Sequence, residues 1–97
     1  MPSKKIIIVE DEPIISADLA GHIRKMGHLV VGRAFNSEKA LDLIAIHQPD
    51  LILLDINIKG TKDGVEVAKV INEKYKIPFI FITSYSDAET LDRVKVT

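Results

Sequence analysis

The stretch IIIVEDEP (residues 6–13) sets four apolar residues directly before three adjacent acids, Glu10, Asp11 and Glu12, and then a proline. An unbroken β-branched run of this kind is typical of a strand that is buried on both faces, as in a parallel sheet. The proline is suited to the first turn of a following helix. Because adjacent carboxylates repel one another, a plain turn would favour Gly, Asn or Ser here. The stretch therefore predicts a buried strand that ends at a site attracting positive charge.

The alternation of a short apolar strand with an amphipathic helix continues along the whole chain. Each helix has its own start signal, such as Pro13, or Asp63 with Glu66, which resembles a capping box. Strands that alternate with helices in this way indicate right-handed βαβ units and a parallel sheet covered on both faces. We expect strands at residues 4–9, 28–35, 50–56 and 79–83, and helices from 13 to the Gly27 stop, over 38–47, from 63 and from 86.

Two of these helices carry more detailed expectations about capping and burial. The second helix is predicted to have Ser37 as its N-cap, because a Ser hydroxyl accepts a hydrogen bond from the first turn. Apolar residues recur at helical spacing in the first helix and predict the face that packs on the sheet. That face consists of Ile15, Leu19, Ile23 and Met26.

Parallel strands bring their carboxyl ends to one edge of a sheet, and ligands of such sheets bind beside that edge. Glu10 and Asp11 follow the first strand, Asp55 ends the third and Thr83 ends the fourth. Carboxylates brought this close raise one another's pKa unless a cation neutralises them. Mg²⁺ fits, because it prefers oxygen ligands and usually takes few protein carboxylates. Glu12 is instead expected to favour the N-terminus of the helix through the helix dipole.

Composition sets the class of protein. The 97 residues, 46% hydrophobic and 28% charged, predict one globular domain over residues 1–97. The net charge of −1 gives no indication of binding to nucleic acid or to an anionic membrane. The lack of cysteine excludes disulfides, thiol catalysis and Cys-ligated zinc, and it agrees with a reducing compartment. No signal peptide and no apolar run near the ~20 residues of a membrane span occur, so a cytoplasmic location is expected.

Together these residues resemble the receiver domain of two-component response regulators, over the full length of the chain. Any one of the matching motifs is weak alone, but their combined spacing is specific. The resemblance rests on the acidic pair Glu10 and Asp11, on Asp55 with the D-x-N step to Asn57, on Asp63 and Gly64 at the start of the third helix, and on Thr83.

The resemblance implies a flavodoxin-like α/β fold with a doubly wound parallel sheet and strand order 2-1-3-4. It implies that a sensor histidine kinase or phosphotransfer protein donates a phosphoryl group to Asp55, and that the chain then switches conformation to control an unknown output domain or effector. Mg²⁺ would be held by Asp11, Asp55 and the Asn57 backbone carbonyl, with Glu10 acting through water. The Thr83 hydroxyl would hydrogen-bond the new phosphate. Such a protein is a signalling switch rather than a turnover enzyme, with no direct nucleic-acid or membrane partner.

The chain departs from the usual receiver pattern in several places. The segment INIKGTKD (residues 56–63) is one residue longer than the commonest pattern and has Lys59 where a proline is frequent. The first acid, Glu10, is a Glu rather than the more common Asp. The usual fifth strand, with its lysine and aromatic residues, is absent, because the sequence ends at Thr97 within the fourth predicted helix. The uncovered fourth strand leads us to expect a dimer through that strand or through the fourth-helix face.

Two other functions remain open from the sequence. An Mg²⁺-dependent phosphohydrolase also uses an Asp at a strand end, although D-x-N fits its usual D-x-D poorly and 97 residues leave no room for a cap. A flavodoxin-like flavin-binding module shares the strand order, but the phosphate of its flavin would meet three repelling acids here. A flavin protein is yellow, whereas a receiver binds beryllofluoride only with Mg²⁺, so these two observations separate the alternatives.

Overall fold

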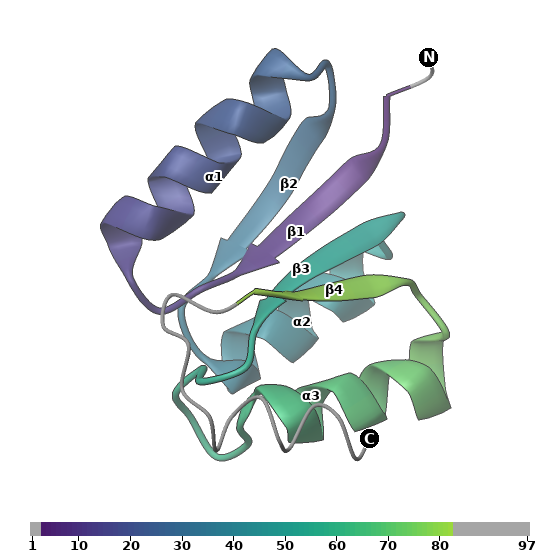
Figure 1. Ribbon diagram of the computed structural model, residues 1–97. Coiled ribbons are helices and arrows are strands. Elements are labelled where there is room, and N and C mark those ends of the chain that lie inside the picture. Colours follow the sequence, from purple (N-terminus) through teal and green to yellow (C-terminus); the bar gives the residue numbers. More distant parts are fainter. Residues whose placement is uncertain (1–2, 83–97) are drawn as a thin grey trace.

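The computed structural model describes residues 3–82, which form a parallel sheet of four strands with helices on both of its faces (Figure 1). The elements in chain order are β1 (Lys5–Val9), α1 (Pro13–Lys25), β2 (Leu29–Ala34), α2 (Ser37–His47), β3 (Leu51–Asp55), α3 (Gly64–Val70), a π-helical turn (Ile71–Tyr75) and β4 (Phe79–Ile82). The strand order is β2-β1-β3-β4, which confirms the order that the resemblance implied. Residue 83 and the last predicted helix lie outside the described residues.

The central strand β1 packs against both helical layers. Its residues Ile6 to Val9 are almost completely buried, as the unbroken apolar run predicts. Ile7 and Val9 join the larger core with α2 and α3, whereas Ile6 and Ile8 pack with α1 on the opposite side of the sheet. Because successive side chains of a strand point to opposite faces, one apolar run supplies both cores. This is the packing expected of a doubly wound sheet.

Helix α1 packs on the sheet through a stripe that differs from the predicted one. Its buried residues are Ser16, Ala20 and Ile23. Met26, predicted to be buried, is 72% exposed because α1 ends one residue earlier and Met26 is its C-cap. Burial of the polar Ser16 is explained by Arg33 of β2, whose Nε donates a hydrogen bond to Ser16 Oγ at 2.8 Å. The predicted apolar face is therefore wrong in its last turn.

Helix α2 begins with a cap that the sequence did not predict. Asn36 is the N-cap, and its Oδ1 accepts a hydrogen bond from the Lys39 N–H at 2.8 Å. The prediction of Ser37 as the cap is wrong, because the buried Ser37 hydroxyl accepts instead from the backbone of the loop between β3 and α3. Asn36 thus caps α2, whereas Ser37 bonds the loop between β3 and α3.

The start of α3 matches its prediction in detail. Asp63 Oδ1 accepts from the Glu66 N–H at 2.9 Å, and Glu66 Oε1 accepts from the Asp63 N–H at 3.2 Å, which is the reciprocal bonding of a capping box. Gly64 follows the cap and lies so close to β3 that a Cβ there would collide with the Asp55 carbonyl and the Ile56 backbone. The first turn of α3 is therefore held directly against the end of β3.

The sheet face beside α1 is only partly covered within residues 3–82. A hollow of about 270 Å³, lined mainly by apolar residues of α1, β1, β3 and β4, opens on that face. Ile80 of β4 is 53% exposed there. Phe79 and Phe81 of the same strand pack against the opposite core, with their rings in a T-shaped arrangement. The expected dimer through this strand stays a prediction.

Candidate functional site

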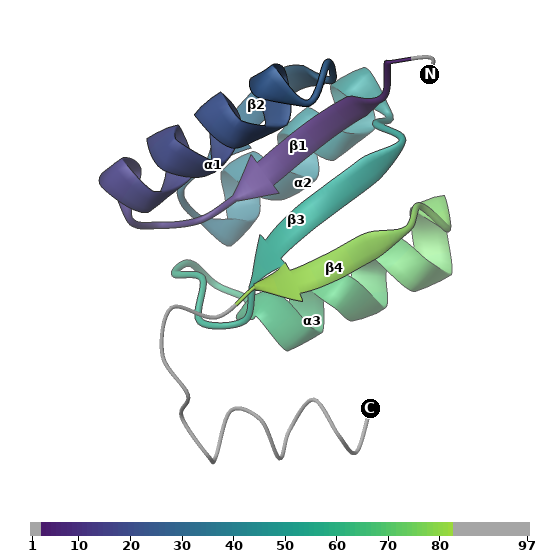
Figure 2. The same cartoon turned by 45° about the horizontal axis from the view of Figure 1, so that its top comes forward.

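The carboxyl ends of β1, β3 and β4 point to the same edge of the sheet (Figure 2). Glu10 follows β1, and its backbone N–H pairs with the Ala34 carbonyl at the end of β2 at 3.0 Å. Asp55 is the last residue of β3. One carboxylate oxygen from each of Glu10, Asp11 and Asp55 lies within 4.8 Å of the other two. The structure therefore brings together the three acids predicted to meet at this edge, and we call them the acidic cluster.

Backbone N–H groups just beyond β1 and β3 orient two of these carboxyl groups. Glu10 Oε1 accepts from the Glu12 N–H at 3.0 Å, and Asp55 Oδ1 accepts from the Asn57 N–H at 3.0 Å. Each bond engages one oxygen of its carboxyl group and so limits the directions that the other oxygen can take. Glu10 and Asp55 are each 2% exposed. The turns after the two strands thus hold two buried acids in fixed orientations.

Burial changes the proton affinity of the acidic cluster. The pKa of Glu10 is raised from 4.5 to about 7, chiefly by burial and further by the nearby Asp55 charge, against the opposing effect of the Glu12 N–H. Burial also raises the pKa of the Asp55 carboxyl, against the lowering effect of the Asn57 N–H. Without a bound cation, the cluster therefore retains a proton at a higher pH than isolated acids would.

We expect the metal-free protein to lose stability as the pH rises from 4.5 to about 7. In this interval Glu10 keeps its proton in the folded state but loses it in the unfolded chain, so folding takes up a proton and each rise in pH weakens it. Thermal melting in EDTA measures the loss, which we expect to total roughly 3 kcal/mol. Glu10→Gln removes the titrating group and should flatten the profile. An equally steep profile in Glu10→Gln would contradict this assignment.

Lys59 places a cation at the rim of the acidic cluster, which the sequence did not predict. Its Nζ lies 3.8 Å from Asp11 Oδ2, and the Lys59 and Asp11 side chains are 82% and 16% exposed. The available sequence signal was a lysine at a loop position where a proline is frequent. The spacing of residues in the sequence does not predict the contact between Lys59 and Asp11, because that contact depends on the path of the loop between β3 and α3.

The loop between β3 and α3 is attached to the first turn of α2. The Ser37 N–H donates to the Lys59 carbonyl at 2.8 Å, and Ser37 Oγ accepts from the Lys62 N–H at 3.2 Å. Glu38 Oε1 accepts from the Thr61 N–H at 2.8 Å, a bond that lowers the pKa of Glu38 to about 2. These contacts, which we call the α2–loop clamp, fix the path of the loop that carries Lys59.

Two further predicted residues can be placed, and one cannot. Asn57 is exposed in the turn after β3, where its N–H bonds Asp55, and its backbone carbonyl stays a predicted metal ligand. Glu12 is the N-cap of α1 and makes no side-chain cap bond, so its electrostatic role at the helix end stays a prediction. Thr83 lies outside the described residues, so its role as the switch hydroxyl stays a prediction.

Three carboxyl groups at this separation suit a hard divalent cation. Mg²⁺ prefers oxygen ligands, keeps several of its waters and needs only one or two protein carboxylates. The two buried members, Glu10 and Asp55, have no ion pair with a lysine, arginine or histidine within residues 3–82. Within those residues, the lysine at the rim of the cluster, Lys59, pairs with Asp11 and with neither buried acid. The donor set of the acidic cluster fits Mg²⁺.

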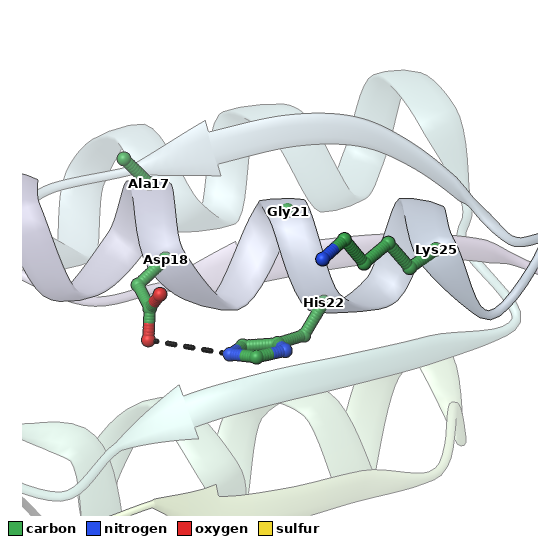
Figure 3. Close-up of a pocket in the computed structure, with 5 residues that line it drawn as sticks. All are labelled: Ala17, Asp18, Gly21, His22 and Lys25. Atoms are coloured by element: carbon green, nitrogen blue, oxygen red, sulfur yellow. Dashed lines mark ion pairs between the residues drawn. The ribbon is translucent and has the colours of Figure 1, made fainter.

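A second hollow, of about 170 Å³, lies on the outward face of α1 (Figure 3). Ala17 and Gly21 leave space there between longer polar side chains. His22 Nε2 lies 3.5 Å from Asp18 Oδ2, and both side chains are mostly exposed. Because both side chains are exposed, water screens the contact between them. This hollow offers charged groups for surface contact rather than a reaction site.

A family model links the geometry of the acidic cluster to known proteins. The model of the response regulator receiver domain matches residues 6–96, which is nearly the whole chain. The chain belongs to the response regulator receiver domain family. Transcriptional regulatory protein PdtaR of Mycobacterium tuberculosis is 32% identical to this receiver over 92 residues, which are 95% of the chain and 44% of PdtaR. The receiver therefore spans less than half the length of that curated relative.

Solved structures of other receivers share the fold. A signal receiver domain of a modulated diguanylate cyclase from Desulfovibrio desulfuricans G20 is 36% identical, with a TM-score of 0.87 over 98% of this chain and 75% of that one. The response regulator PhyR from Brucella abortus is 33% identical, with a TM-score of 0.80 over 87% of this chain and 35% of that one. The recognition as a receiver and the flavodoxin-like α/β fold are thus confirmed.

Proposed function

We propose that this receiver accepts a phosphoryl group on Asp55 and then switches conformation to control an output. The observation that carries the proposal is the place of Asp55, which ends β3, is oriented by the Asn57 N–H, and lies within 4.8 Å of two further acids. A carboxylate is a competent nucleophile for phosphoryl transfer, as in aspartyl-phosphate ATPases. Membership of the receiver family, whose members are signalling switches, supports the same role.

In this proposal the acidic cluster also holds Mg²⁺. Asp11 and Asp55 bind the ion through their carboxylates, Asn57 through its backbone carbonyl, and Glu10 through a water molecule. Bound there, the ion supplies positive charge against the oxygens of the transferring phosphoryl group. Asp55 reacts in its ionised form, so its raised pKa has to be overcome before the transfer. The Thr83 hydroxyl then hydrogen-bonds the phosphate that Asp55 carries.

The proposed partners are other proteins. A sensor histidine kinase or phosphotransfer protein is the proposed donor, and an output domain or effector protein is the proposed target. PhyR from Bartonella quintana, 32% identical to this receiver, has been solved in complex with the anti-sigma factor NepR, which supports a protein target for a receiver of this kind. No helix within residues 3–82 is both long and apolar enough to cross a bilayer. We propose a cytoplasmic location for the phosphoryl transfer.

Mg²⁺ is expected to raise the melting temperature of the protein by binding to the acidic cluster. A ligand that binds only the folded state stabilises it by RT ln(1 + [L]/Kd), which is about 1.4 kcal/mol at roughly tenfold excess over Kd. Asp11→Asn should be more stable than the parent in EDTA, because it relieves repulsion within the cluster, and it should gain little from Mg²⁺. Melting curves in EDTA and in Mg²⁺ measure both effects.

Asp18→Asn is the matched control for this experiment. Asp18 lies on the outward face of α1 with a side chain that is 74% exposed, so its loss should leave the Mg²⁺ response at the parental size. If Asp11→Asn and the parent respond equally to Mg²⁺, the carboxylates of the acidic cluster are not the metal site.

A further inference from the structure

We propose that Lys59 is a tethered cation that occupies the rim of the acidic cluster, and that Mg²⁺ has to displace it. The α2–loop clamp holds Lys59 in that place, which makes Glu38 a positioning residue for the metal site. The inference rests on the proposed function, because the site concerned is the Mg²⁺ site of that function. It adds two residues, Lys59 and Glu38, that set how tightly the site binds its ion.

Lys59 is the cation that lies against the acidic cluster. Lys59 Nζ lies 3.8 Å from Asp11 Oδ2, and Asp11 is one of the three acids whose oxygens approach one another within 4.8 Å. The Asp11 side chain is only 16% exposed, so water screens its charge poorly, whereas Lys59 is 82% exposed and can turn outward. A single charge on a flexible arm lowers the repulsion within the metal-free cluster. The Lys59 ammonium also opposes the binding of Mg²⁺ at the cluster, because two positive charges a few ångströms apart repel each other.

Two residues of α2 fix the loop that carries Lys59. The Ser37 N–H donates to the Lys59 carbonyl, Ser37 Oγ accepts from the Lys62 N–H, and Glu38 accepts from the Thr61 N–H. Ser37 Oγ also donates to Glu38 Oε2 at 3.1 Å, so the two clamp side chains hold each other. Without these bonds the loop could take many paths, and the Lys59 ammonium would occupy many positions in solvent. The clamp therefore concentrates its charge at the rim of the cluster.

Gly60 allows the close approach between the loop and α2. Its φ of 121° lies in the region that favours glycine, and a Cβ there would collide with Ser37 Oγ and Glu38 Oε2. Beside it, Asn36 and Lys59 pair in a parallel β-bridge. The loop is thus shaped against α2 over consecutive residues.

Isothermal titration with MgCl₂ tests the competition directly. We expect Lys59→Met to bind Mg²⁺ about fivefold more tightly than the parent, because it removes one largely solvated charge 3.8 Å from Asp11 Oδ2, a proposed ligand of the ion. Lys62→Met is the matched control, because it removes the same charge from the same loop, at a lysine with no ion pair within residues 3–82. It should change the affinity by less than about twofold, since Lys62 makes no ion pair with Asp11 or with any other acid of residues 3–82.

A second comparison tests the positioning role of Glu38. Glu38→Ala removes the acceptor of the Thr61 N–H, so Lys59 no longer has a fixed place. When Lys59→Met is added to Glu38→Ala, Mg²⁺ binding should therefore tighten by less than about twofold. Glu38→Gln keeps a side-chain oxygen as acceptor and should restore most of the Lys59 effect. If Lys59→Met keeps its full effect in the Glu38→Ala background, Glu38 is structural only and the positioning role is wrong.

The outcomes separate this inference from the proposed function. If the parent binds Mg²⁺ and Lys59→Met binds it with unchanged affinity, Lys59 does not compete, and the inference is wrong while the proposed function stands. An equal tightening in Lys59→Met and Lys62→Met would also overturn the inference, because the general charge of the loop would explain both. If the parent does not bind Mg²⁺, the metal site of the proposed function fails and the inference fails with it.

Discussion

Asp55→Asn is expected to abolish labelling of the chain by a small-molecule phosphodonor in the presence of Mg²⁺. The substitution keeps the shape of the side chain but removes the nucleophilic carboxylate at the end of β3. The parent should gain the mass of one phosphoryl group in a linkage that base cleaves, because an acyl phosphate is labile to base. Intact-mass spectrometry before and after base treatment measures both properties.

Glu12→Gln is the control for the labelling experiment. Glu12 is exposed at the N-cap of α1 and is not one of the three clustered acids, so its loss should leave labelling intact. Undiminished labelling of Asp55→Asn would show that another residue is the acceptor and would refute the proposed function. Loss of labelling in both variants would point to a general effect of charge rather than to a nucleophile at residue 55.

Gly64→Ala is expected to destabilise the fold by roughly 3 kcal/mol, the upper part of the range for overpacking. The new Cβ would collide with the Asp55 carbonyl and the Ile56 backbone, which cannot turn aside as a flexible side chain does. The Gly64 N–H also donates to the Ile56 carbonyl at 3.0 Å, so relief requires α3 to separate from the end of β3. Urea unfolding of the parent and the variant measures the difference.

Gly21→Ala is the matched control, with the opposite sign expected. Gly21 lies within α1, and a Cβ there would meet no heavy atom within 4 Å. Alanine is favoured over glycine inside a helix by about 0.5–1 kcal/mol, so this variant should be more stable than the parent. If Gly64→Ala unfolds at the parental urea concentration, α3 can shift without cost and is not held against β3 as described.

The elements that could be predicted are those whose cause is local in the sequence. The run at residues 6–9 is apolar enough to be buried on both faces, and Asp63 with Glu66 makes a reciprocal cap without help from other elements. The errors at Met26 and Ser37 have a different origin. Met26 has helical spacing, but α1 ends before it, and Ser37 has the right chemistry for a cap but a tertiary partner takes its hydroxyl.

The same distinction applies to the candidate site. The meeting of Glu10, Asp11 and Asp55 follows from parallel topology alone, because parallel strands end at the same edge of the sheet. The contribution of Lys59 could not be predicted, since its contact with Asp11 depends on the path of a loop. Glu38, which bonds this loop, is distant in sequence from the Thr61 N–H that it accepts.

Thr61 and Lys62 lie in a surface loop, yet the amides of both donate to side-chain oxygens of α2. Hydrogen exchange at these two amides therefore requires the loop and α2 to come apart, rather than a local fluctuation of the loop alone. These two hydrogen bonds couple the loop to the first turn of α2. Any rearrangement of the loop beside Asp55 must either break these bonds or carry the first turn of α2 with it.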